Sequence, residues 1–242
     1  VEINYKNNEE YRNKALNLSY QIALARYLGW VTLLNKQDIG IIINDTSSKD
    51  YVSGYSIENE KFTQDKYSAL VTVNFDKQKI EQLLTGKKVD YFLKKGPRTL
   101  LIPLVKFKDR LILWDDPNPW FDAWLRRPLD SNLTEFILPS GEVDDLITLN
   151  AEEAKSLKYY KIKNLTSKYS AEEALVLIVN LFETNNKYSF NLEAYNGLKQ
   201  EQISLQQLGL KSSNKLNEDL LSLANKFADN YDDMWVKKNI DR

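Results

Sequence analysis

Residues 174–195 read ALVLIVNLF, ETNNK and YSFNLEAY, and this stretch decides the fold class. Its two outer runs are rich in β-branched, aromatic and other apolar residues, which is typical of strands. The five polar residues between them, 183–187, suit a connection between neighbouring strands. The stretch therefore predicts a β-hairpin in the second half of the chain.

A second pair of strands and two long helices are predicted around this hairpin. Residues 50–60 and 67–75 indicate paired strands, because the second run alternates two sets of side chains. Helices are expected from about Asn7 to Leu34 and from about Asn214 to Lys238. Steps of four and three residues mark the stripe of the first helix that should face the core. That stripe consists of Tyr11, Ala15, Leu18, Ile22, Ala25 and Gly29.

The remaining predicted elements are short and depend on caps and prolines. Asp76, Asn118 and Asn150 are good N-cap residues, and Pro103 suggests an edge or a bulge in its strand. We expect helices over 76–86, 119–127 and 150–169 and strands over 99–106, 110–114 and 136–138. The order of elements predicts an α/β (α+β) fold of two mixed modules, each with a small sheet packed by helices.

The boundary between the two modules is predicted in the basic stretch 87–98, which contains Gly96-Pro97. We place the first module at residues 1–95 and the second at residues 96–242. The favoured interpretation of Lys87–Lys95 is a solvated linker, and the alternative is a site for an anion or a lipid headgroup.

The composition excludes several classes of chemistry. The chain of 242 residues has no histidine and no cysteine. This excludes Ser-His-Asp and Cys-His catalysis, Cys/His zinc sites, His-ligated haem and disulfide scaffolds. The 33 basic and 34 acidic residues are interspersed, which argues against a nucleic-acid partner. No apolar run approaches the roughly 20 residues that cross a bilayer, so no transmembrane segment is expected. No glycine-rich phosphate loop occurs, and we expect no cofactor.

The densest group of large side chains is LWDDPNPWFDAW at residues 113–124. The functional interpretation is an aromatic platform for a sugar, a peptide or a partner protein, with acids beside it. The structural interpretation is a helix anchored in the core by its large rings, and it is favoured because aromatics at helical spacing are more often buried. The candidate binding residues are Trp114, Asp115, Asp116, Trp120 and Trp124.

Paired carboxylates are the remaining route to hydrolytic chemistry. The candidates are Asp115 with Asp116 and Asp144 with Asp145, and either pair could in principle bind Ca²⁺ or Mg²⁺. Neither has the spacing of an EF-hand, and adjacent acids on a strand point to opposite faces. We therefore interpret both pairs as solvated loop residues, and we predict no catalytic residue and no metal site.

The succession of motifs along the chain resembles an uncharacterised proteobacterial family, domain of unknown function 2066. The resemblance implies an exported envelope protein of Gram-negative bacteria without an assigned activity, and no catalytic residue can be carried over from it. It also favours Val1 as a mature N-terminus from which a signal peptide has been removed. The matching motifs are the Ala-rich helix 15–28, YVSGY at 51–55, VTVNFD at 71–76, LIP at 101–103, LW at 113–114, WxxxW at 120–124, the acidic pair at 144–145 and WVK at 235–237.

Two functional hypotheses follow from the sequence. The leading one is a non-enzymatic periplasmic protein that works by contact with an envelope protein partner. The alternative is a carboxylate-dependent hydrolase of an envelope polymer, which requires Asp115, Asp116 or Asp122 to meet Asp144 or Asp145 in a cleft. A small-molecule carrier would need a deep apolar cavity, and the sequence neither supports nor opposes it. The sequence leaves the oligomeric state open.

Overall fold

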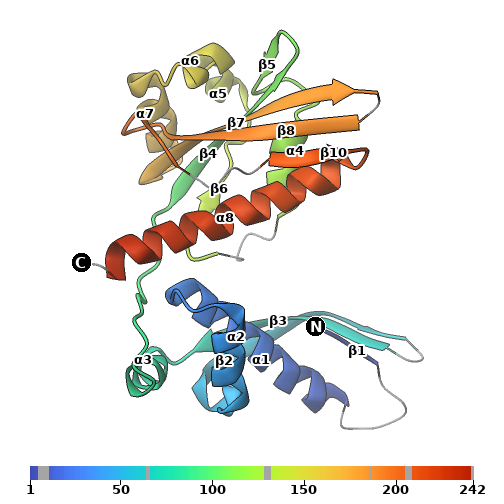
Figure 1. The fold of residues 1–242 in the computed structure, drawn as a ribbon, viewed down its shortest axis with the longest axis vertical. Coiled ribbons are helices and arrows are strands. Elements are labelled where there is room, and N and C mark those ends of the chain that lie inside the picture. Colours follow the sequence, from blue (N-terminus) through green and yellow to red (C-terminus); the bar gives the residue numbers. More distant parts are fainter. Residues whose placement is uncertain (5–10, 64–65, 128–131, 186, 205–208, 241–242) are drawn as a thin grey trace. The chain divides into compact units, whose positions relative to one another are not determined.

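A computed structural model describes residues 1–4, 11–63, 66–127, 132–185, 187–204 and 209–240. The chain divides into two compact units: Val1–Lys94 with Trp235–Arg242 form unit 1, and Lys95–Met234 form unit 2. Both units are mixed α/β structures in which helices pack on a sheet, as predicted (Figure 1). The boundary predicted after residue 95 lies one residue from this division. The last residues of the chain, which were placed in the second module, group instead with unit 1.

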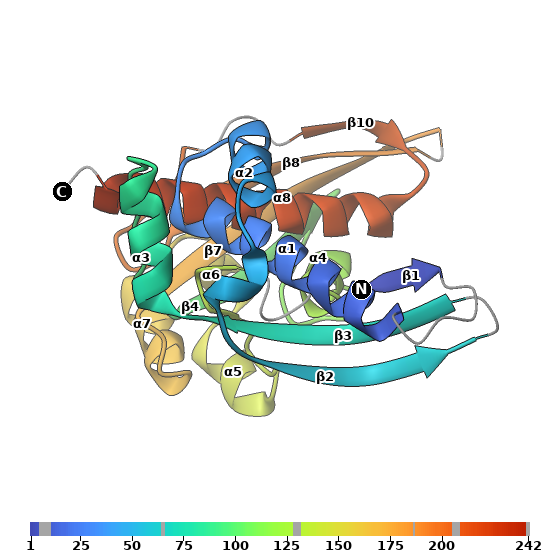
Figure 2. The same ribbon diagram turned by 90° about the horizontal axis from the view of Figure 1, so that it is seen from below.

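Unit 1 is built on a three-stranded antiparallel sheet. Its elements are β1 (Glu2–Asn4), α1 (Tyr11–Val31), α2 (Lys36–Asn44), η1 (Ser48–Tyr51), β2 (Val52–Phe62), β3 (Lys66–Phe75) and α3 (Lys77–Gly86). The strand order is β1-β3-β2, and the predicted β2–β3 pairing is confirmed, with Tyr55 opposite Val73. Helix α1 lies along the sheet (Figure 2), and its Ala15 packs with Tyr67 and Ala69 in a small core.

The predicted stripe of α1 is right at Ala15, which is buried, but further along the helix a different face meets the core. Leu18 and Ile22 belong to the predicted stripe but are exposed, whereas Tyr20, Leu24 and Leu28 are buried. Residues four apart share a face on any side of a helix. The face with Tyr20, Leu24 and Leu28 packs on the core because burying its larger side chains removes more apolar area from water.

Three short elements of unit 1, β1, α2 and η1, were not predicted. Helix α2 begins after Asn35, whose side chain accepts hydrogen bonds from the N–H groups of Gln37 and Asp38. Helix α1 ends at Val31 rather than Leu34, and its predicted start at residue 7 falls outside the described residues.

Unit 2 contains a seven-stranded mixed sheet with β4 and β7 in parallel at its centre. The main path is β10-β8-β7-β4-β5, while β6 pairs with β4 and β9 pairs with β8. The predicted hairpin of β7 and β8 is confirmed, with Leu177 opposite Ala194. Helix α8 (Leu216–Ile240) belongs to unit 2 as far as Met234. The other elements are β4 (Thr99–Phe107), β5 (Arg110–Ile112), α4 (Pro119–Leu125), β6 (Phe136–Ile137), α5 (Val143–Thr148), α6 (Ala151–Lys155), α7 (Tyr159–Lys168), β7 (Glu173–Thr184), β8 (Lys187–Asn196), β9 (Glu201–Gln202) and β10 (Gly209–Ser213).

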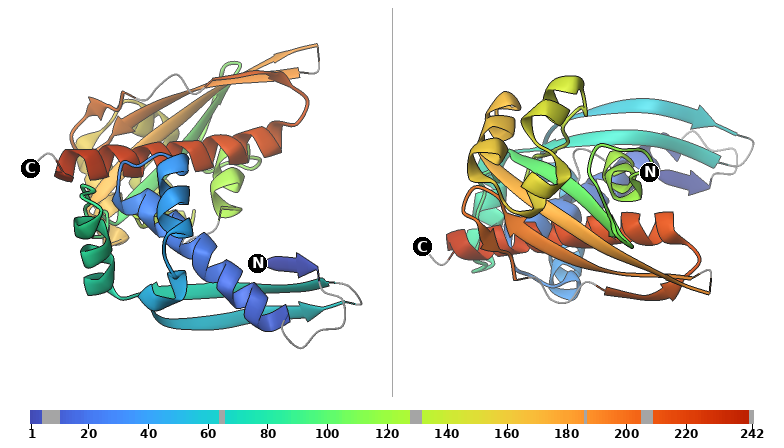
Figure 3. Two further views of the ribbon diagram at one scale, coloured as in Figure 1. Left: turned by 60° about the horizontal axis from the view of Figure 1, so that its bottom comes forward. Right: turned by 90° about the horizontal axis from the view of Figure 1, so that it is seen from above.

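The sheet of unit 2 has an apolar core on each face, because successive side chains of a strand point to opposite sides. Leu175, Leu177 and Val179 of β7 join one core with residues of α4 and α8. Val176 and Ile178 join the other core with residues of α6 and α7. Figure 3 shows α8 in red on one side of the sheet and the yellow helices on the other. This double cover explains why the central strands are apolar almost throughout.

Pro103 lies at a local edge within the central strand β4. It stands opposite Leu177 of β7, and its carbonyl accepts a hydrogen bond of 3.0 Å from Asn118 Nδ2. On the side of β4 away from β7, strand β6 pairs only with Thr99 and Leu100, and strand β5 pairs only from Val105 onward. The proline therefore interrupts no backbone ladder, because the missing N–H faces the gap between β6 and β5.

The predicted single helix over residues 150–169 is two helices, α6 and α7. The predicted capping box at Asn150 and Glu153 is present. The helix nevertheless stops after one turn, because Leu157 has a positive φ of 52° and the Lys158 N–H donates to the Glu153 carbonyl. A left-handed residue with this backward hydrogen bond is a common way for a helix to end.

Candidate functional site

Trp120 and Trp124 are core residues and form no exposed platform. The Asn118 side chain caps α4 by accepting the N–H groups of Trp120 and Phe121, while its Nδ2 donates to the Pro103 and Leu113 carbonyls. This cap ties the helix to the sheet, with Trp120 fully buried and its ring 5.5 Å from that of Trp124. The predicted binding platform is therefore wrong at these two positions, and their role is structural.

Trp114 belongs to the opposite face of the sheet. Its ring is half-buried against the second core, and its Nε1 donates a hydrogen bond of 2.6 Å to the Leu149 carbonyl. The three candidate tryptophans are thus divided between two cores. Asp115 and Asp116 are exposed, and they share no apolar patch with Trp120.

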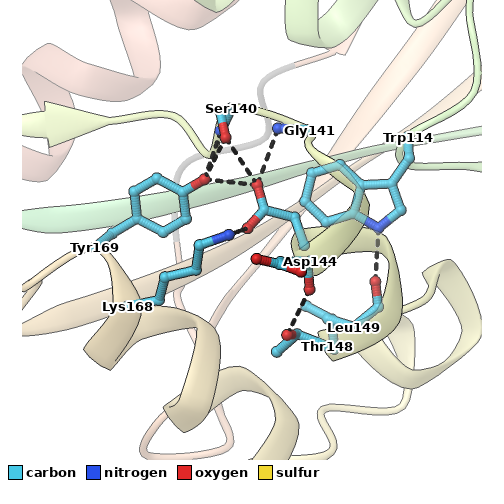
Figure 4. A network of polar contacts seen from close by, with 9 residues as sticks. Trp114, Ser140, Gly141, Asp144, Thr148, Leu149, Lys168 and Tyr169 are labelled. Atoms are coloured by element: carbon cyan, nitrogen blue, oxygen red, sulfur yellow. Dashed lines mark hydrogen bonds and ion pairs between the residues drawn. The ribbon is translucent and has the colours of Figure 1, made fainter.

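Asp145 is the most densely bonded carboxylate that the structure describes, and Figure 4 shows its surroundings. Its side chain has no exposed area. Lys168 Nζ lies 2.7 Å from Oδ1, and Oδ2 accepts from Tyr169 Oη at 2.6 Å and from the Gly141 N–H at 2.9 Å. Ser140 Oγ lies 3.3 Å from Oδ2, and the Ser140 N–H donates to Tyr169 Oη at 2.7 Å. The prediction that Asp145 is a solvated loop residue is therefore wrong.

The donors around Asp145 keep it ionised. Burial alone would raise the pKa of a carboxyl group, because it disfavours the charged form. Hydrogen bonds from Lys168, Tyr169 and the Gly141 N–H outweigh that effect and hold the pKa of Asp145 below its ordinary value. The same contact raises the pKa of Lys168. The pair is therefore charged on both sides under ordinary conditions.

This network fixes α5, a helix of six residues. A helix this short is unstable alone, because it makes few hydrogen bonds for the residues that it orders. Asp145 binds it to the loop at Ser140 and Gly141 before it and to the end of α7 at Lys168 and Tyr169. Gly141 has a positive φ of 72°, a conformation that favours glycine. The buried carboxylate is thus a tether for the helix.

The opposite side of α5 is apolar and faces solvent. Val143 and Ile147 are 70% and 71% exposed, and Leu146 is 44% exposed. Their spacing of three and four residues puts them on one face of the helix. Asp145, two positions after Val143, points to the other side and into the protein. We call Val143, Leu146 and Ile147 the α5 face.

The geometry favours a tether over a catalytic base at Asp145. Ser140, Tyr169 and Asp145 do form a chain of hydroxyl and carboxylate contacts, and Ser140 is exposed. A carboxylate that accepts from a lysine, a tyrosine and a backbone N–H, with a lowered pKa, has little tendency to take a proton. In the part of the chain that the structure describes, no three acidic side chains gather where they could hold a metal ion.

Sequence reasoning missed both the tether and the α5 face. Asp144 and Asp145 were singled out, but the partners of Asp145 on α7 lie 23 and 24 residues away. The one local signal is the pattern Val143, Leu146 and Ile147, which has helical spacing. That signal indicates a helix face and would ordinarily be assigned to the core.

Comparison with known proteins gives no match, either among protein-family models or among curated proteins. Among the described residues, no helix is long and apolar enough to cross a membrane.

Proposed function

We propose that the protein is a non-enzymatic interaction module that binds a partner protein through the α5 face. The observation that carries this proposal is a tethered helix whose apolar side faces solvent. Single exposed apolar residues are common on protein surfaces, but grouped ones mark interaction sites. Here Val143, Leu146 and Ile147 are grouped on one helix face.

The tether makes the surface rigid before binding. The α5 helix is held by Asp145, and Thr148 Oγ1 donates to the Asp144 carbonyl one turn earlier at 2.6 Å. A surface that is already ordered loses less conformational entropy when a partner docks. A short recognition helix can therefore bind with few contacts.

The cellular setting is part of the same proposal. We place the protein in the periplasm of a Gram-negative bacterium, with an envelope protein as its partner. This placement is supported by the resemblance to the envelope family and by a chain without cysteine, which suits an oxidising compartment. The family assignment itself remains a prediction.

A photoreactive amino acid at Ile147, followed by mass spectrometry, tests the binding surface in cells that express the protein. We expect one dominant protein adduct at Ile147 and none at Leu125, an exposed apolar residue of α4 that serves as the matched control. The substitution Val143→Asp should remove the adduct without changing the unfolding curve, because Val143 is largely exposed. Equal adduct patterns at Ile147 and Leu125 would refute the proposal.

A further inference from the structure

We infer that the partner docks on the α5 face with a basic amphipathic segment, in which apolar side chains are flanked by Lys or Arg. This inference rests on the proposed function and adds the chemistry of the partner. It starts from the charges beside the apolar face. Glu142, the N-cap residue of α5, and Asp144, in its first turn, are both exposed.

The two carboxylates border the face on opposite sides. Each residue of a helix turns about 100° from the one before it. Relative to Val143, Glu142 projects to one side of the apolar face and Asp144 to the other. Among the described residues, neither forms an ion pair. Asp144 does act on the nearby Lys168, whose pKa its charge helps to raise, but Lys168 forms its ion pair with Asp145. Both exposed carboxylates can therefore still meet positive charge on a partner.

The chain segment that carries α5 contributes no positive charge of its own, and Lys168, the cation beside it, is bound to Asp145. Between residues 132 and 154 the chain has no Lys or Arg. Trp114 packs close to the start of α5, since a Cβ built on Gly141 would lie 3.9 Å from its ring. The exposed Asp115 and Asp116 follow Trp114 directly in the chain. Charge complementarity then selects a basic partner and speeds its encounter with the face.

The same charges argue against two other occupants. An apolar helix face can also insert into a membrane surface, but carboxylates on both sides repel the anionic headgroups that attract such helices. A second copy of α5 would bring two sets of Glu142 and Asp144 into one interface without an added cation, which is unfavourable.

Two fluorescent peptides test the inference on the full chain. One is an amphipathic helix of leucine and lysine, and the other carries glutamate in place of lysine. We expect the full chain to bind the lysine peptide and not the glutamate peptide. Asp144→Lys should weaken binding of the lysine peptide by about tenfold or more, and Ile147→Asp should abolish it. Glu201→Lys, an exposed charge reversal on β9, is the matched control and should leave binding unchanged.

The outcomes separate this inference from the proposed function. Equal binding of both peptides, or no difference between Asp144→Lys and Glu201→Lys, overturns the basic partner, while a specific adduct at Ile147 would still support docking. If no specific adduct forms at Ile147 in the otherwise unaltered chain, the proposed function itself is refuted. Binding to phosphatidylglycerol vesicles that Ile147→Asp removes would assign the face to a membrane. A dimer in sedimentation that Ile147→Asp dissociates would assign it to a second copy, and either result overturns the inference.

Discussion

Replacing Asp145 by alanine tests the tether on which the α5 face depends. The substitution removes the carboxylate that accepts from the Gly141 N–H and the Tyr169 hydroxyl, and each lost bond to a charged acceptor costs about 1–2 kcal/mol. The Lys168 side chain is 35% exposed, so its ammonium group can turn to water and adds little. We therefore expect Asp145→Ala to lower the free energy of unfolding by about 2–4 kcal/mol.

Urea unfolding followed by tryptophan fluorescence measures this loss, with hydrogen exchange over residues 143–149 as a local readout. The matched control is Asp144→Ala on the same helix. Its exposed carboxylate forms no hydrogen bond or ion pair with the residues that the structure describes, so the change should be about 0.5 kcal/mol or less. Exchange in α5 should accelerate in Asp145→Ala and stay unchanged in Asp144→Ala. If the two variants behave alike in both measurements, Asp145 is not a tether.

The pH dependence of stability in the same variant tests the tether independently. The folded pKa of Asp145 lies below its ordinary value of 3.8. Stabilisation by a carboxylate with a lowered pKa is complete above the unfolded pKa and is lost as the pH falls through the folded pKa. The stability difference between the wild type and Asp145→Ala should therefore be constant near neutral pH and shrink below pH 3.8. A difference that grows in acid would contradict the reasoning.

Three further predictions concern the buried Trp120, the helix cap Asn118 and the pKa of Tyr67. Trp120→Ala should cost about 3–5 kcal/mol in urea unfolding, while Leu125→Ala on the exposed side of α4 should cost about 0.5 kcal/mol; similar losses would contradict the assignment of Trp120 to the core. Asn118→Ala should cost about 2 kcal/mol, because both the helix cap and two bonds to carbonyls are lost. Asn118→Asp keeps the cap acceptor, so its loss by the same measurement should be smaller. Burial and the hydrogen bond to Glu60 raise the pKa of Tyr67 to about 12. Because this pKa is raised in the folded state, stability should fall from pH 10 to about 12, and Tyr67→Phe should remove that loss in alkaline unfolding curves.

Features that depend on neighbouring residues could be predicted from the sequence. The caps at Asp76, Asn118 and Asn150 are all present, because their hydrogen bonds close within three residues. The β7–β8 hairpin was predictable for the same reason, since a short polar connection joins its strands. Local chemistry of this kind needs no knowledge of the rest of the fold.

The side of a helix that meets the core could not be predicted in this way. Helical spacing groups Trp120 with Trp124 and Val143 with Ile147 by the same rule, yet the first pair is buried and the second is exposed. Partners far away in the chain decide which side of each helix faces the core. For α4, Asn118 bonds to the Pro103 carbonyl 15 residues earlier. The charged tether of α5 reaches α7 in the same way.

The position of Asp145 explains why the apolar side of α5 faces solvent. A helix that served only to fill a core would turn Val143 and Ile147 inward and leave its carboxylates in water. In α5 the arrangement is reversed, because the buried group is the charged one. Burying a carboxylate is unfavourable unless a cation and several donors compensate it, and Lys168, Tyr169 and Gly141 provide that compensation. The result is an apolar face held rigidly toward solvent, which a binding surface requires and a core does not.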